Sequence, residues 1–577
     1  MSTTLLKGGT FFDGRGGDGR RADVLVENEK VTRIAETIDA PPGASVIDAT
    51  GRWVMPGFID LHTHYDAEVE LLPGLQESVR HGVTSVVMGS CSLSLAIGDP
   101  TNLADMFCRV EAIPRSVVLP LLKERKTWNT PTEYLDHLDS LPLGPNVSSF
   151  FGHSAMRMHT MGIGRSLEKK VVPTSEELGK MDRLLAEALD VGYLGMSIQT
   201  LPWDKMDGEE FRSRPLPSVF ARWSEYRHFA RALRARDRVL QAVPNVSTKI
   251  NAILLFLMST GVFRKRLRTT AISMMDIRAD RFAFFIAAEI ARFLNSALGA
   301  DLRLQALPEV FDLWADGVDL VVFEEFGAGT AALHLADLTD RAKKLRDPEY
   351  RAWFKKEWRS RWIPRAFHRN LEWCEVLDAP DASLKGKTFT QIANERGQDV
   401  VDTFLDLCAD YGKDLRWFTV MGNDRPEWLE WIVSHPAAII GFSDAGAHLR
   451  QMAHYNFPLR MLKLVRDAET RGKPFMSVGR AVHRLTAEIG DWLGMDAGTL
   501  AEGKRADLVV VDPAGLDASV DQVAEEEIPF FGGLKRLVRR NDRAVSTVMI
   551  GGKLAWSNGA AAPALGREKL GRVLRAN

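Results

Sequence analysis

The chain has 577 residues, which is too long for one compact core and suits a large domain with a smaller one beside it. Hydrophobic residues make up 45% of the sequence and charged residues 26%, as in ordinary globular proteins, and the formal net charge is only -2. This balance excludes a strongly basic nucleic-acid-binding protein and gives no reason to expect an anionic membrane as a partner.

Three features of the sequence bear on where the protein resides. The first residues, Met1-Ser-Thr-Thr, lack the basic and apolar stretches of a signal peptide. The four cysteines include no CxxC pair, which excludes a disulfide framework and favours a reducing compartment. The longest apolar run, residues 252–258, is far shorter than the roughly 20 residues of a membrane helix, so we interpret it as a buried helix or strand. We therefore expect a cytoplasmic protein.

Both ends of the chain contain short strand-like segments bounded by turns. The four clearest are residues 23–27, 30–34, 508–511 and 545–556. We predict that the two ends form one small β-sandwich domain, residues 1–57 and 493–577, beside a central domain of residues 58–492. Two unrelated terminal subdomains are the alternative.

The central region alternates strand-like and helix-like segments. Residues 83–88 are typical of a buried strand. Thr174 and Glu177 form a capping box that starts a helix, and a strand candidate follows at residues 193–197. Repeated strand–helix units imply parallel strands with right-handed crossovers, and a region of this length favours an α/β fold of the (β/α)8 barrel type. The charged, tryptophan-rich stretch around residues 310–370 is expected to be a helical insertion.

The strongest signal for chemistry is Pro56-Gly-Phe-Ile-Asp-Leu-His62-Thr-His64-Tyr-Asp66. The apolar residues before the histidines are typical of a buried strand, and side chains two positions apart on a strand point the same way. His62 and His64 therefore project together, and neutral imidazoles are good ligands for zinc and similar ions. Active sites of barrels lie at the C-terminal ends of their strands. We predict that the pair binds a metal; two hydrogen-bonded core histidines are the alternative.

A second signal is Ile439-Ile-Gly-Phe-Ser-Asp444-Ala-Gly-Ala-His448-Leu. A short apolar strand delivers Asp444 into a loop of small residues, which leaves room for a substrate. Asp444 can ligate the metal, take a proton from water and pass it to a leaving group. An Asx-turn or a helix cap is the alternative. His448 either supports the site from behind or contacts the substrate.

Together, the Gly-Phe-Ile-Asp-Leu-His-Thr-His-Tyr-Asp and Ser-Asp-Ala-Gly-Ala-His motifs and the split β domain resemble the amidohydrolase superfamily. Within it the chain looks most like the D-aminoacylase (N-acyl-D-amino-acid deacylase) branch. Gly89-Ser-Cys91-Ser resembles the strand-2 segment whose cysteine binds metal. Phe151-Gly-His153-Ser-Ala-Met-Arg157 is similar to the strand-3 segment, and residues 192–197 to the strand-4 segment. The stretch Gly-Thr-Leu-Ala-Glu-Gly-Lys-Arg-Ala-Asp-Leu at residues 498–508 is shared across the superfamily.

The chain departs from that branch where histidines are expected on strands 5 and 6. Residues 238–245 and 268–276 contain none, and Gln241, Asn245 and Asp276 stand near the expected positions as weak candidates. The strand-4 segment has no lysine, so a carbamylated bridging lysine is not expected. We predict one ion, with zinc the expected metal, held by His62, His64 and Asp444 with water in the open position. Cys91 is either a fourth ligand or an inert buried thiol.

The resemblance implies hydrolysis of a linear amide C–N bond in N-acyl-D-amino acids or related N-acyl compounds, a small-molecule substrate. Water activated by the metal attacks the acyl carbon, and Asp444 carries its proton to the leaving amine. His153 either donates to the oxyanion or packs the barrel. Arg157 and Arg450 are the candidates for the substrate carboxylate, with His153 and His448 also placed at the substrate. The D-configuration and a homo-oligomer are expectations from the resemblance alone.

Three other functions are compatible with the sequence. The substrate is another amide, such as a cyclic amide or an N-acylated xenobiotic. Alternatively, the site catalyses a lyase or decarboxylase reaction, or the chain is a non-catalytic protein with the same fold. The basic runs at residues 264–268 and 535–540 are interpreted as solvated faces.

Overall fold

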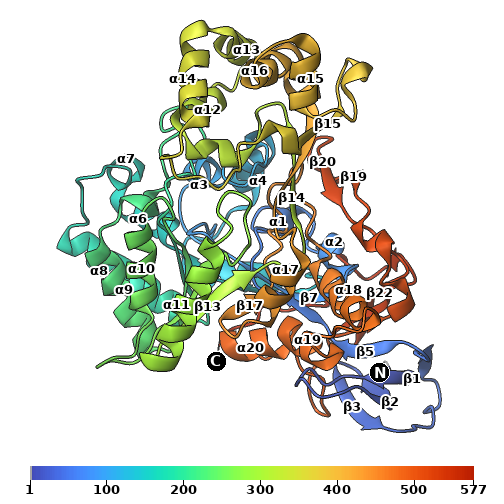
Figure 1. Cartoon of the computed structure of the whole chain (residues 1–577). Helices are drawn as coiled ribbons and strands as arrows, with labels where there is room; N and C mark the ends of the chain where they lie inside the picture. The colour runs from blue at the N-terminus through green and yellow to red at the C-terminus, as the bar shows by residue number, and fades with distance from the viewer. Residues whose placement is uncertain (1–2, 577) are drawn as a thin grey trace.

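The computed structural model describes residues 3–576, and strands from the two ends of the chain meet in one nine-stranded sheet (Figure 1). The strand order is β23-β22-β21-β18-β5-β1-β2-β3, with β4 paired to β1. The strands are β1 (Thr3–Phe11), β2 (Arg20–Glu27), β3 (Lys30–Ala35), β4 (Ser45–Asp48), β5 (Trp53–Pro56), β18 (Leu508–Val511), β21 (Val545–Ile550), β22 (Lys553–Ser557) and β23 (Ala560–Ala561). The two halves join where β18 pairs antiparallel with β5. The strands predicted at both chain ends are thus confirmed.

Apolar side chains from both ends of the chain form the core of this sheet. Leu6 and Val24 of the first half pack in one cluster with Leu508 and Val510 of the second. Within the range 493–577, however, the hairpin of β19 (Ala524–Glu527) and β20 (Lys535–Val538) leaves the sheet. Its Arg536 forms a buried ion pair with Glu68, at 2.8 Å, so this hairpin is anchored to the central region.

The central region contains parallel strands separated by helices, which confirms the predicted α/β class. One sheet has the order β6-β7-β8 and the other β17-β13-β12-β11-β10-β9, and every pairing in both is parallel. The strands are β6 (Phe58–Asp60), β7 (Val83–Met88), β8 (Asn146–Ser149), β9 (Phe151–Gly152), β10 (Gly195–Gln199), β11 (Val239–Val243), β12 (Arg268–Ile272), β13 (Asp301–Ala306) and β17 (Ala438–Ile440).

The two parallel sheets meet at both of their edges. Phe150 alone separates β8 from β9, and its N–H donates to the carbonyl of Met88 on β7, at 3.0 Å. At the other edge Thr63, just after β6, forms a parallel bridge with Ala445, just after β17. The hydrogen-bonded pairings therefore run in a ring.

Helices cover the outside of these strands, and α3, α5, α8 and α19 each begin after a residue whose side chain caps the helix. Thr174 and Glu177 form the predicted capping box at the start of α8, and Ser477 caps α19. The helices are α1 (Glu68–Leu71), α2 (Gln76–Val79), α3 (Pro100–Phe107), α4 (Arg115–Arg125), α5 (Pro131–Ser140), α6 (His153–Met161), α7 (Ile163–Ser166), α8 (Ser175–Asp190), α9 (Trp223–Ala235), α10 (Lys249–Met258), α11 (Ala283–Ala297), α17 (Pro426–Ser434), α18 (Phe457–Thr470), α19 (Val478–Leu485) and α20 (Ala487–Leu493).

A separate unit is inserted between β13 and β17 and lies at the top of Figure 1. It has its own apolar cluster, which includes Phe323, Phe404 and Trp417. Its elements are β14 (Phe311–Asp316), β15 (Cys374–Asp378), β16 (Arg416–Gly422), α12 (Gly327–His334), α13 (Leu338–Arg346), α14 (Pro348–Arg359), α15 (Phe389–Arg396) and α16 (Val400–Tyr411). The insertion is longer than the predicted range 310–370 and contains an antiparallel sheet, β14-β16-β15, as well as helices.

Among the described residues, no helix combines the length and the apolar character that crossing a membrane requires.

Candidate metal centre

Strand β7 and the loop after β17 hold the predicted histidine pair in place after β6. The N–H of Thr63 donates to Val87 on β7 at 3.0 Å, and the N–H of His64 donates to Ala445 at 2.8 Å on the opposite side. The 62–64 segment is therefore extended, and both imidazoles project the same way. The loop after β17 approaches so closely that a Cβ at Gly446, where φ is +89°, would lie 2.7 Å from the His64 carbonyl oxygen. Only glycine fits there without a shift.

Four donor atoms converge at this point. The Nε2 atoms of His62 and His64 lie 3.2 Å apart, and Cys91 Sγ lies 3.4 Å from His62 Nε2. Asp444 Oδ1 lies 3.4 Å from His62 Nε2 and 3.5 Å from His64 Nε2. Two imidazoles, a thiol and a carboxylate at these separations are a donor set that suits zinc.

Cys91 reaches the histidines because its loop takes an unusual backbone path. Cys91 and Ser92 have positive φ angles of 56° and 67°, in the left-handed region that non-glycine residues seldom adopt. Hydrogen bonds hold this path: Gln241 Oε1 accepts from the Cys91 N–H at 2.8 Å, and Ser197 Oγ accepts from the Ser92 N–H at 3.1 Å. Strands β10 and β11 thus fix the position of the thiol.

Buried polar groups that the sequence did not reveal hold both imidazoles from behind. His62 Nδ1 lies 2.6 Å from Gln305 Oε1, and His64 Nδ1 lies 3.2 Å from Glu111 Oε1. An Nδ1–H donated to the Gln305 oxygen leaves the His62 Nε2 lone pair facing the other donors, as in metal-bound histidines. Gln305 is a lone buried amide on β13, and Glu111 lies in a loop, so neither belongs to a recognisable motif.

Burial and charge set the protonation of this group. Burial lowers the pKa of His62 to about 4, which keeps that imidazole neutral. Burial also opposes a charge on His64, but the carboxylates of Glu111 and Asp444 raise the pKa of His64 well above its ordinary value. Despite its burial, Asp444 has a pKa held below the ordinary value by the hydrogen bond from His64 and by the neighbouring imidazoles. Burial raises the pKa of the Cys91 thiol to about 12.

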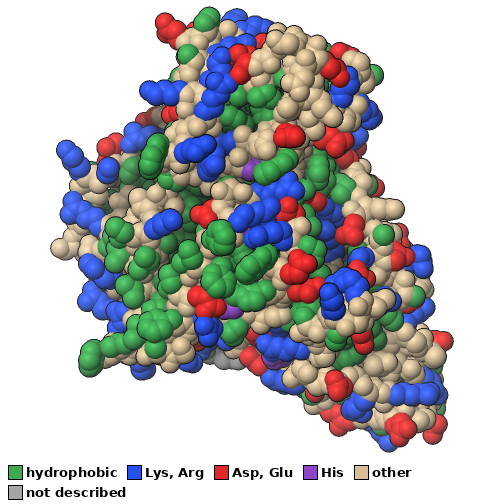
Figure 2. Space-filling view, in the orientation of Figure 1, with side chains coloured by type: hydrophobic (Ala, Val, Ile, Leu, Met, Phe, Trp, Pro, Cys, Tyr) green, Lys and Arg blue, Asp and Glu red, His purple; other side chains and the backbone are tan. Residues whose placement is uncertain are grey.

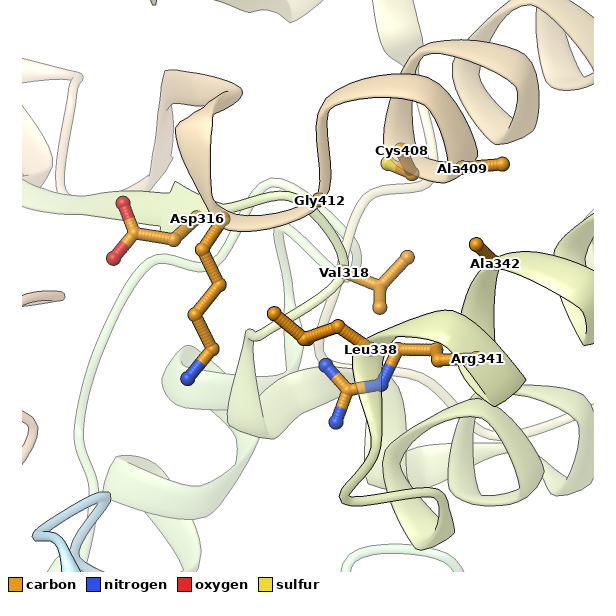
Figure 3. Close-up of a pocket in the computed structure, with 9 residues that line it drawn as sticks. Asp316, Val318, Leu338, Arg341, Ala342, Cys408, Ala409 and Gly412 are labelled. Atoms are coloured by element: carbon orange, nitrogen blue, oxygen red, sulfur yellow. The ribbon is translucent and has the colours of Figure 1, made fainter.

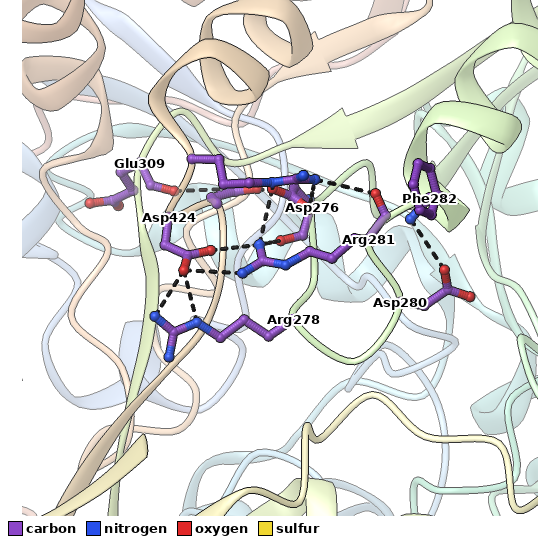
Figure 4. A network of polar contacts seen from close by, with 9 residues as sticks. Asp276, Arg278, Asp280, Arg281, Phe282, Glu309 and Asp424 are labelled. Carbon is purple, nitrogen blue, oxygen red and sulfur yellow. Dashed lines mark hydrogen bonds and ion pairs between the residues drawn. The ribbon is translucent and has the colours of Figure 1, made fainter. Parts of the chain in front are cut away.

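The weak candidates at the strand-5 and strand-6 positions have other partners. Gln241 supports Cys91 as described, and Asn245 accepts from the Ser247 N–H at 3.0 Å. Asp276 is buried and binds Arg425 at 2.7 Å and Arg281 at 3.1 Å, in the arginine–aspartate network of Figure 4. Asp276 therefore already has two cationic partners, and the structure does not bring it to the histidine pair.

The residues predicted to contact substrate are divided between two environments. His448 is buried beside Asp444 and His64, and burial lowers its pKa to about 4. Arg450, by contrast, forms ion pairs with Asp316 at 2.5 Å and with Glu525 at 3.4 Å. His448 therefore lies at the candidate site, whereas Arg450 is paired with Asp316 of the insertion.

His153 and Arg157 are fully buried on α6, and each is held by partners within the protein, as in the alternative in which His153 packs the barrel. His153 Nε2 lies 3.0 Å from Glu225 on α9, and its Nδ1 lies 3.0 Å from the hydroxyl of Ser218. Arg157 pairs with the same carboxylate of Glu225. Both side chains are held by a buried acidic partner that lies far along the sequence, which no local pattern could predict.

A small hollow elsewhere in the chain does not compete as an active site. It lies within the insertion, between β14, α13 and α16, and is lined by Asp316, Val318 and Arg341 among others (Figure 3). Its volume of about 30 Å³ has room for little more than a water molecule. None of the four converging donors lines it.

Replacing Gln305 by alanine is expected to weaken zinc binding by about 10–100-fold, because the His62 Nδ1–H loses its buried acceptor. A chelator-competition titration measures this. Gln305→Glu, which keeps an acceptor oxygen, is expected to bind zinc at least as tightly as the native protein. Gln391→Ala, which removes an amide from the distant cap of α15, is the control. Equal zinc affinity in Gln305→Ala and the native protein would show that His62 needs no support.

Zinc affinity is expected to rise with pH. His64 carries a proton because its pKa is raised, and the Cys91 thiol is also protonated; both must lose their protons to act as ligands. Each proton released makes the affinity rise by about tenfold per pH unit, and titrations between about pH 6 and 8 measure the slope. A flat profile would mean that the donors need not lose protons and would contradict this ligand set.

Comparison with known proteins gives a consistent set of similarities. Residues 45–159 match the sequence model of the Amidohydrolase family. An uncharacterized protein of Mycobacterium tuberculosis is 47% identical over 560 residues, which span 96% of this chain and 92% of that protein. The N-acyl-D-glutamate deacylase of Alcaligenes xylosoxydans xylosoxydans is 33% identical over 193 residues, 33% of this chain and 36% of that enzyme.

Two solved structures share the fold over 99% of both chains. The N-acyl-D-glutamate deacylase from Bordetella bronchiseptica, crystallised with zinc and a phosphonate inhibitor, superimposes with a TM-score of 0.63 at 21% identity. A D-aminoacylase superimposes with a TM-score of 0.61 at 20% identity.

Proposed function

This chain belongs to the amidohydrolase family, in its D-aminoacylase branch, and from that premise we propose that it hydrolyses the linear amide bond of N-acyl-D-amino acids or related N-acyl compounds. The enzyme class is that of a metal-dependent hydrolase. The observation that carries the proposal is the convergence of His62, His64, Cys91 and Asp444 from three separate segments of the chain. The proposed preference for D-configured substrates rests on the relatives, an N-acyl-D-glutamate deacylase and a D-aminoacylase.

The donor set fits a single divalent ion, with zinc the best match. The ligand atoms of His62, His64 and Cys91 all lie within 4.8 Å of one another, and Asp444 Oδ1 lies within 3.5 Å of both imidazoles. The positions expected to complete a second site hold Gln241, Asn245 and Asp276, and each has another partner in the protein. When bound, the ion would lower the pKa of water and polarise the substrate carbonyl.

The side chains of this chain then have distinct tasks. Gln305 and Glu111 orient the two imidazoles, and the Asp444 N–H donates to the His62 carbonyl at 3.2 Å, which keeps Asp444 beside them. Asp444, ionised because its pKa is lowered, accepts the proton from water and delivers it to the leaving amine. His448, neutral and next to Asp444, is placed to contact the substrate.

We also infer that the ring of parallel pairings is a (β/α)8 barrel, with β8 and β9 forming one strand. The bridge between Thr63 and Ala445 and the bond from Phe150 to Met88 support closure. The nine-stranded sheet supports a separate domain from residues 1–57 and 493–577. The four cysteines are all free thiols, which supports a cytoplasmic location.

A screen of amine release tests the substrate. N-acetyl-D- and N-acetyl-L-amino acids, a cyclic amide and a formylated or acetylated aromatic amine are offered to protein loaded with zinc. We expect turnover of at least one N-acyl-D-amino acid and little of its L-form. Turnover of the cyclic amide alone would favour ring opening, and elimination products would favour a lyase. Zinc that binds without any turnover would contradict the proposal.

A further inference from the structure

The apolar run at residues 252–258 forms α10, as a helix was predicted, but much of it is not buried. Ile253, Leu254 and Leu257 are each at least 40% exposed, while Leu255, Phe256 and Met258 face the core. A helix that is apolar all round is normally enclosed by protein or by lipid. One side of α10 is packed against the core, and its outer apolar side is exposed to solvent.

The exposure continues across the neighbouring turn and helix. Eleven of the twenty large hydrophobic side chains exposed in the described part of the chain lie between residues 246 and 293. The six that are more than half exposed are Val246, Ile250, Phe263, Phe282, Ile286 and Phe293. We call this surface the α10–α11 face, and Figure 2 shows its apolar side chains gathered over those two helices. Exposed patches of this kind mark interaction sites.

The charge around the α10–α11 face is positive. Residues 246–298 contain eight lysines and arginines against three acidic residues, but Arg266, Arg268, Arg278 and Arg281 are paired with acidic residues outside this range. Arg264, Lys265 and Arg266 follow Phe263 directly, and all are exposed. Of the acidic residues, Asp276 is buried, and Glu289 is paired with Arg292. Lys249, Arg264 and Lys265 form no ion pair within residues 3–576, so their charges are available to a partner.

We propose that the α10–α11 face docks onto the surface of an anionic lipid bilayer, with its apolar side chains entering the headgroup region and its basic residues meeting the lipid phosphates. Apolar helix faces bordered by Lys and Arg bind membranes in this way. Phe263 is fully exposed at the tip of a turn, and a protruding aromatic side chain enters a fluid bilayer more readily than a flat protein surface. A second copy of the chain would bring like charges together around the same apolar face.

Flotation with vesicles tests this proposal. The full chain is mixed with vesicles of phosphatidylcholine containing about 30% phosphatidylglycerol, or with phosphatidylcholine alone. We expect binding to the anionic vesicles, and its loss in about 1 M NaCl, where the Debye length is about 3 Å. The variant F263S/K265E is expected to bind at least about tenfold more weakly while keeping its zinc affinity.

The matched control is W362S/R361E, which removes an equally exposed aromatic side chain and an adjacent basic one in the insertion, and it is expected to bind like the native protein. Light scattering after gel filtration is run in parallel. A dimer that F263S/K265E dissociates, without vesicle binding, would overturn the proposal and identify the face as an interface between copies. Absence of both vesicle binding and dimer, or equal loss in the control, would also overturn it.

Discussion

Replacing Asp444 by asparagine is expected to lower kcat/KM for an N-acyl-amino acid by roughly a thousandfold, because a positioned acid–base group contributes about 10²–10⁴-fold. The asparagine keeps the size of the side chain, and His62, His64 and Cys91 remain, so the variant should still bind zinc. Steady-state amine release and metal analysis of the same preparation separate these two effects.

The matched control is Asp410→Asn, which neutralises an exposed carboxylate in the insertion paired with Arg346. We expect it to behave like the native enzyme. Native activity in Asp444→Asn would show that Asp444 does not transfer the proton. Loss of zinc in the same variant would instead make Asp444 chiefly a ligand.

Replacing Glu225 by glutamine is expected to lower the free energy of unfolding by about 3–5 kcal/mol, as for other buried ion pairs that lose one partner. Arg157 is fully buried and pairs with Glu225, and its Nε and Nη2 have no hydrogen-bond partner among the described residues. The variant therefore leaves a buried guanidinium without a compensating charge. Urea denaturation followed by tryptophan fluorescence measures the change.

The difference in free energy of unfolding between the native protein and Glu225→Gln depends on pH. Burial opposes ionisation of Glu225, but His153 and Arg157 lower its pKa from 4.5 to about 2. A lowered acid pKa contributes stability that is complete above the ordinary pKa and is lost as pH falls toward the lowered one. The native protein and Glu225→Gln should thus differ fully above about pH 4.5 and converge toward about pH 2.

Glu176→Gln is the control, because Glu176 pairs with Lys180 on an exposed helix face, where such pairs contribute less than about 1 kcal/mol. If Glu225→Gln were as stable as the control variant, the buried network would not be needed to hold α6 against α9.

The parts of the site that the sequence revealed are those in which residue type and strand position act together. His62 and His64 follow a buried strand at a spacing that aligns them, and Asp444 follows another. The sequence alone is compatible with Cys91 as a ligand or as an inert thiol, and the structure places its sulfur 3.4 Å from His62 Nε2. The alternation of strands and helices was equally readable, because it depends on local periodicity.

What the sequence could not reveal are contacts between segments far apart in the chain. Gln305 lies 243 positions from His62, and Glu225 lies 68 positions from Arg157. Neither has a motif around it; a polar side chain within the buried strand β13 was the one available hint at Gln305. The insertion is longer than its local sequence pattern indicates, because β14 and β16 pair across about a hundred residues.

The most direct test of the account is a zinc-edge anomalous difference map from a crystal grown with zinc. We expect one peak, bonded to His62 Nε2 and His64 Nε2 at about 2.0–2.1 Å and to Cys91 Sγ at about 2.3 Å, with Asp444 as a further ligand or at hydrogen-bond distance from a bound water. A zinc peak away from these atoms, or no peak in crystals grown with excess zinc, would contradict the proposed centre.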